Sequence, residues 1–125
     1  MANAIDAKSI LLKIGGVPEF SQLVDSNVKL TTECLLSGEH GKWWAKEWDE
    51  DGIHYEAGVC VDWVSDSCSG GPGYIASLAV AQTWEGPWGF SSTDLARAEV
   101  KEDCEMSEDK CIELAYAKLC ATLDV

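Results

Sequence analysis

Carboxylates dominate the residues of this chain whose types could support a function. Positions 47 to 96 hold nine acidic residues and no Lys or Arg, and seven of the nine lie between positions 47 and 66. An anionic stretch of this kind favours a basic partner, because opposite charge steers a partner to its binding surface. The alternative is a solvated face that only promotes solubility. We predict a partner-binding surface made of Trp43, Asp49, Glu50, Asp51, Glu56, Asp62 and Asp66.

Tryptophan is the second unusual feature, with six in the chain and three in the short run Trp43, Trp44 and Trp48. Neighbouring residues of a strand point to opposite faces, so Trp43 and Trp44 do not both face the core. We therefore predict that Trp43 is exposed and anchors an interface, a frequent role of tryptophan. A sugar ring stacked on this side chain is the alternative use, and a covering layer or loop would remove both.

The sequence predicts neither a metal site nor a catalytic site. The first, third, fifth and sixth positions of a calcium loop are matched by Glu47, Asp49, Asp51 and Gly52. The twelfth position is Gly58, where such a loop needs a bidentate glutamate. The chain has no Cys-x-x-Cys motif and only two histidines, His40 and His54, which leaves little choice of zinc ligand or general base. We expect a non-enzymatic protein without a cofactor, although two suitably spaced acids for sugar hydrolysis remain an open alternative.

These residues are positioned by the stretch 42–64, which predicts a β-hairpin. Asp51-Gly52 between two strand-like runs is a strong signal for a type I′ turn, which needs positive φ at both central residues. The two-residue loop places Trp48 across from Tyr55 on the apolar face. It also places Glu47 across from Glu56, and like charges in this arrangement are destabilising. The apolar face of the second arm comprises Ile53, Tyr55, Ala57, Val59, Val61 and Trp63.

The other segments give a coarser outline. A helix starts at Asp6 or Ser9 and ends at Gly15-Gly16, and a second short helix has Pro18 in its first turn. A strand is predicted for 28–36, loops for 65–73 and 85–92, and a capped helix for 107–123. For 74–84 the pattern favours a strand over a helix. For 94–103 an edge strand and a helix are nearly equal alternatives.

Together these elements predict a single α+β domain over residues 1–125. A β-meander of four or five antiparallel strands is packed on one face by the N-terminal helices and the C-terminal helix. The net charge of −13 disfavours direct binding to nucleic acid or to an anionic membrane. The N-terminus lacks the features of a signal peptide and no apolar run could span a bilayer, so we expect a cytoplasmic protein. Its six cysteines are then reduced.

In charge, size and lack of catalytic residues, the chain resembles the decoy proteins by which phages block host restriction or CRISPR nucleases. The resemblance implies an inhibitor that imitates nucleic acid and occupies a Lys/Arg-rich surface of a nucleic-acid-handling protein. A small-ligand or carbohydrate-binding module that uses exposed Trp is the alternative. A secreted domain stapled by disulfides is a second alternative.

Overall fold

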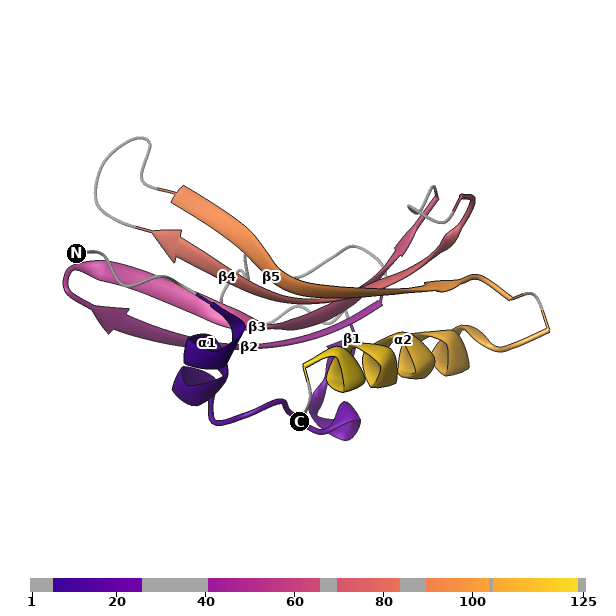
Figure 1. Ribbon diagram of the computed structural model, residues 1–125, viewed down its shortest axis with the longest axis horizontal. Helices are drawn as coiled ribbons and strands as arrows, with labels where there is room; N and C mark the ends of the chain where they lie inside the picture. The colour runs from indigo at the N-terminus through magenta and orange to yellow at the C-terminus, as the bar shows by residue number, and fades with distance from the viewer. Residues whose placement is uncertain (1–5, 26–40, 66–69, 84–89, 104, 124–125) are drawn as a thin grey trace.

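The computed structural model describes residues 6–25, 41–65, 70–83, 90–103 and 105–123. Five strands form one antiparallel sheet in the order β1-β2-β3-β4-β5, and α1 and α2 pack against it (Figure 1). This confirms the predicted α+β class. The elements are α1 (Ala7–Ile14), the 3₁₀ turn η1 (Phe20–Gln22), β1 (Val24–Asp25), β2 (Gly41–Glu50), β3 (Ile53–Val64), β4 (Gly73–Thr83), β5 (Phe90–Lys101) and α2 (Glu108–Thr122).

The predicted hairpin is confirmed as β2 and β3, including its register. Glu50 pairs with Ile53 and Trp48 pairs with Tyr55, so the loop has two residues. Asp51 has φ of 52° and Gly52 has φ of 78°, which are the left-handed values that the turn requires. The Trp48 and Tyr55 rings stack with their centroids 5.3 Å apart, as expected for cross-strand aromatic partners.

The two ambiguous segments are both strands. The first is β4, as the pattern favoured, and the second is β5, which lies at the edge of the sheet. Ala98 is buried while Arg97 and Lys101 are exposed, in agreement with the predicted charged outer face. The predicted loop 85–92 extends too far toward the C-terminus, because β5 already starts at Phe90, which pairs with Thr83 of β4. A register shift at Leu78/Ala79 locally interrupts the β4–β5 ladder.

Both helices cover the same face of the sheet and leave the other face without a helix among the described residues (Figure 1).

Asp6 caps α1 by accepting a hydrogen bond from the Ser9 backbone N–H at 2.8 Å, and Gly15 ends the helix with φ of 84°. Ser107 caps α2, as predicted. Neither helix in the described ranges has the length and apolar character of a membrane span.

The segment between α1 and the sheet differs from the prediction. The expected second helix is only the short turn η1, and the next residues form β1, which pairs with the outer edge of β2 through Val24 and Trp43. The Tyr116 hydroxyl of α2 donates a hydrogen bond to the Pro18 carbonyl oxygen, which attaches this segment to the helix. The strand predicted for 28–36 lies outside the described residues.

The core lies between the helices and the central strands. Its fully buried side chains include Val59, Val61, Leu78, Val80 and Leu119. Gly58 of β3 faces away from the helices, and its backbone lies unusually close to β2. A Cβ atom at this position would lie 1.9 Å from the Trp44 carbonyl oxygen. Only glycine allows this approach, which accompanies the strong twist of the sheet seen in Figure 1.

Candidate functional site

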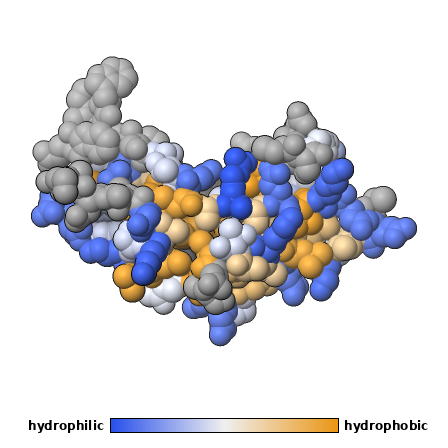
Figure 2. Space-filling view, in the orientation of Figure 1, coloured by the Kyte–Doolittle hydropathy of each residue, from blue (hydrophilic) through white to orange (hydrophobic). Residues whose placement is uncertain are grey.

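Three of the predicted contact residues lie together at the turn of the β2–β3 hairpin. Asp49, Glu50 and Asp51 are all exposed, and the side chain of Asp49 is 82% accessible. The turn lies at the left end of the molecule in Figure 1, where hydrophilic side chains gather in the space-filling view (Figure 2). The two-residue turn and the paired strands hold these carboxylates on a rigid backbone. We call Glu47, Asp49, Glu50 and Asp51 the hairpin-tip carboxylates.

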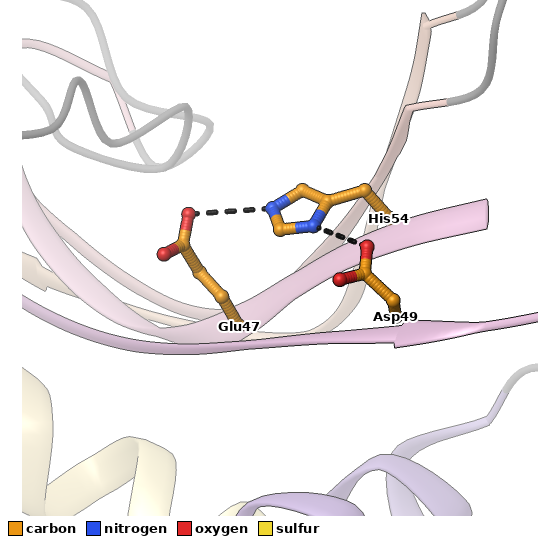
Figure 3. Close-up of polar contacts among 3 residues, drawn as sticks. All are labelled: Glu47, Asp49 and His54. Atoms are coloured by element: carbon orange, nitrogen blue, oxygen red, sulfur yellow. Dashed lines mark hydrogen bonds and ion pairs between the residues drawn. The ribbon is translucent and has the colours of Figure 1, made fainter. Parts of the chain in front are cut away.

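A histidine that faces the solvent on β3 connects two of the hairpin-tip carboxylates (Figure 3). His54 Nδ1 lies 2.9 Å from Asp49 Oδ1, and His54 Nε2 lies 3.4 Å from Glu47 Oε1. The hydrogen bond to Asp49 raises the pKa of His54; desolvation lowers it, and the hydrogen bond to Glu47 raises it further. The imidazole therefore gains a proton more readily than an isolated histidine and then offsets part of the local negative charge.

A second positive charge near the hairpin-tip carboxylates comes from α1, where Lys13 forms an ion pair with Glu50. The nearby lysines of β2 leave the hairpin-tip carboxylates unneutralised. Lys42 pairs instead with Asp25 at 2.8 Å, and Lys46 forms no ion pair within the described part of the chain. Counting the described residues, four carboxylates thus lie near one lysine and one histidine. This end of the molecule carries a net negative charge at neutral pH.

The prediction that Trp43 is exposed is wrong. Its side chain lies on the sheet face opposite the helices, as the alternation indicated, but the residue is only 6% accessible. On either side it has register partners, Val24 of β1 and Cys60 of β3, so β2 is an interior strand at this point. Its indole N–H is buried and has no hydrogen-bond partner in the part of the chain that the structure describes. Trp43 therefore offers no surface on which a partner or a sugar could stack.

Glu56 is also buried, although it lies on the predicted face. It is 3% accessible, because β3 runs between β2 and β4 and places it between Glu47 and Ala81. The predicted Glu47–Glu56 apposition is present in the register. The two carboxylates occupy different environments: Glu56 is buried, whereas Glu47 is exposed and turns toward His54. This separation reduces the repulsion that we expected between them.

The predicted surface does not assemble into one patch. Asp62 pairs in register with Gly41 at the other end of the hairpin, eight residues beyond His54 and roughly 26 Å away along the strand. It is half-buried, and its Oδ1 accepts the Trp63 backbone N–H at 3.1 Å. Asp66 lies outside the described residues. Of the six predicted residues that the structure describes, only Asp49, Glu50 and Asp51 form a common exposed surface.

Two groups of residues were missed by the sequence reasoning. The first is the pair Glu47 and His54, which the hairpin register itself brings near Asp49. The second lies at the opposite end of the sheet, where acidic residues follow β5 and begin α2. A cavity of about 520 Å³ opens there. The acidic run from Glu102 to Asp109 is visible in the sequence and was the available signal, but its position beside aromatic residues depends on the pairing of β3 with β4.

The described residues contain no cluster of three or more His, Cys, Asp or Glu side chains that could hold a metal ion. Cys60, Cys111 and Cys120 are free thiols. Burial raises the pKa of both Cys60 and Cys120, which disfavours the reactive thiolate. Cys60 Sγ instead lies 3.3 Å from Ser77 Oγ on the sheet face opposite the helices. These thiols are therefore ordinary partly or fully buried side chains.

Comparison with known proteins adds no functional assignment. No protein-family model matches the chain, no curated protein matches its sequence, and no solved structure matches its fold.

Proposed function

We propose that this protein is a non-enzymatic, acidic binding protein that occupies a basic surface of a nucleic-acid-handling protein. The contact surface is the end of the β2–β3 hairpin. The observation that carries the proposal is the exposed set of hairpin-tip carboxylates, Glu47, Asp49, Glu50 and Asp51, on a rigid turn with little internal compensation. The mode of action is that of a decoy, in which carboxylates take the place of phosphates.

The geometry of the hairpin end favours a macromolecular partner over a small ligand. The carboxylates sit on a convex turn and its flanking strands, whereas small molecules bind in concave and mostly apolar sites. A convex anionic turn fits into a groove, and proteins that bind nucleic acids have grooves lined with Lys and Arg. The net charge of −13 adds long-range attraction to such a surface.

The carbohydrate-binding alternative loses its main support, because it depended on an exposed Trp43. The half-buried Trp44 and Trp48 pack against the core from the helix-covered face of the sheet. We therefore carry forward only the acidic binding function.

A pull-down from cell lysate at low salt, followed by elution in a salt gradient, tests the proposal. The hairpin variant is Asp49→Asn/Asp51→Asn, which removes two charges with little change of shape, and asparagine tolerates the left-handed backbone at position 51. The matched control, Asp94→Asn/Glu113→Gln, removes two charges from exposed positions on β5 and α2.

We expect the wild-type protein and the control variant to retain a common nucleic-acid-binding protein that the hairpin variant releases at lower salt. Added DNA or RNA should compete with this retention, because both ligands use the same basic surface. Equal retention by the hairpin variant, or retention that salt does not weaken, would contradict the proposal.

A further inference from the structure

The cavity at the end of the sheet far from the hairpin tip has two kinds of wall. It lies where β3 ends, β4 begins and β5 leads into α2, toward the right of Figure 1. Its apolar wall comprises Trp63, Tyr74, Met106 and Cys111. Its acidic wall comprises Glu102, Asp103 and Glu108. The volume of about 520 Å³ falls within the range of small-ligand sites.

Tyr74 contributes a hydroxyl group to the apolar wall. The residue is 4% accessible, and its register partner on β3 is the half-buried Trp63. The Tyr74 hydroxyl has no hydrogen-bond partner among the described residues. The ring is thus buried while the hydroxyl lines the cavity, where it is an available contact for a ligand donor.

The acidic wall is also available to a ligand. Glu102 and Glu108 are exposed and form no ion pair with any described residue. Asp103 accepts the Glu105 backbone N–H at 2.9 Å, and the Glu102 backbone N–H donates to the Pro72 carbonyl oxygen at 3.1 Å. These backbone contacts fix the rim while they leave the Glu102 and Glu108 carboxylates free to bind.

The electrostatic environment of Tyr74 supports the same picture. Burial raises the pKa of its hydroxyl, and the negative charges of Glu108 and Glu102 raise it further. A ligand that carries a positive charge would relieve this accumulation of negative charge around the cavity.

We propose that this cavity binds an organic cation, an ammonium or guanidinium group on an apolar stem. The carboxylates of Glu102 and Glu108 neutralise the charge, the Tyr74 hydroxyl accepts a hydrogen bond, and the aromatic wall contacts the stem. Aromatic rings also attract cations directly. A bare metal ion fits less well, because the described residues hold no group with metal-ligand geometry. The proposal does not depend on the hairpin, which lies at the opposite end of the sheet.

The test is an NMR titration of the ¹⁵N-labelled protein at physiological salt, with the Trp63 indole N–H resonance assigned by a Trp63→Phe variant. The probes are N-acetyl-arginine amide, N-acetyl-lysine amide and the neutral analogue N-acetyl-norleucine amide. Agmatine and cadaverine, which lack the amide backbone, distinguish a free cation from a side chain presented by a polypeptide.

We expect saturable shifts at residues lining the cavity with at least one cationic probe, and at least five-fold weaker binding of the neutral analogue. Glu102→Gln/Glu108→Gln should weaken binding at least five-fold, and Tyr74→Phe should weaken it about two-fold or more. Asp49→Asn/Asp51→Asn should leave the affinity for the cationic probe unchanged. The cavity proposal and the hairpin proposal can therefore be refuted independently of each other. Equal binding of the neutral analogue, or shifts spread over all acidic surfaces without saturation, would overturn the proposal.

Discussion

Replacing Gly58 with alanine should destabilise the protein strongly. The same change at Gly15, Gly16, Gly52, Gly70 or Gly71 should cost less, because an added Cβ at these positions meets no atom within 4 Å. The added Cβ would lie 1.9 Å from the Trp44 carbonyl oxygen and 2.7 Å from the Ala45 Cα. Real Cβ contacts are not found below 3.0 Å, so β2 and β3 must separate by about 1.1 Å. Both obstructing atoms belong to the backbone, which cannot rotate away as a side chain would.

The size of the effect follows from what this separation breaks. A shift of about 1 Å weakens the backbone hydrogen bonds on either side of Gly58, each of which contributes about 1 kcal/mol. It also loosens the packing of the adjacent buried residues Ala57 and Val59, and overpacking in a core costs about 1–3 kcal/mol. We therefore expect a loss of about 3–5 kcal/mol, a large part of the 5–15 kcal/mol that stabilises a typical domain.

Urea denaturation followed by tryptophan fluorescence measures this loss. The control is Gly52→Ala at the hairpin turn. A Cβ there meets no atom within 4 Å, but the φ of 78° is unfavourable for alanine and should cost about 1–2 kcal/mol. If Gly58→Ala costs no more than Gly52→Ala, the close approach of the strands is not the reason for glycine at position 58. Failure of the Gly58 variant alone to fold would agree with the prediction.

Three further predictions test other parts of the structure. Leu78→Ala, at a fully buried position, should lower the free energy of unfolding by about 2–5 kcal/mol, whereas Leu12→Ala, at a residue that is 79% accessible, should change it by less than about 0.5 kcal/mol in urea denaturation. His54 should titrate by NMR above its usual pKa of 6.5. Because the pKa of His54 is raised in the folded state, the protonated histidine stabilises the fold fully below its unfolded-state pKa. This stabilisation disappears as the pH rises through the folded-state pKa. The variant His54→Gln should abolish this part of the pH dependence of stability. Tyr116→Phe should cost about 1–3 kcal/mol in urea denaturation, because the Pro18 carbonyl loses its donor, and an unchanged midpoint would contradict a role for that hydrogen bond.

Local signals in the sequence were sufficient to predict the hairpin and its register. Asp51-Gly52 determines a two-residue turn, and strict alternation then fixes which residues of β3 share a face. Local signals also predicted the cap Ser107 and narrowed the start of α1 to Asp6 or Ser9, because a cap depends on its own helix alone. The strand β1 carries no comparable signal, since two residues are too few to show a period.

Depth of burial was the property that the pattern could not give. Alternation placed Trp43 and Glu56 on the correct face but not at the correct exposure. A side chain on the uncovered face of a sheet is buried or exposed according to its neighbours on adjacent strands, and these are distant in sequence. Asp62 shows the related difficulty. It belongs to the same acidic stretch of the sequence as the hairpin tip, but it lies roughly 26 Å from His54 along the strand.

The hydrogen bond between Tyr116 and Pro18 has a consequence for the order of folding. Among the described strands, every pair of neighbours in the sheet is consecutive in chain order, so the sheet can assemble by successive closures between nearby segments. The Tyr116–Pro18 contact joins residues 98 positions apart, and the entropy lost on closing a loop grows with its length. We therefore expect the amino-terminal segment to dock last and detach first, so that its amides exchange with solvent earlier than those of the central strands.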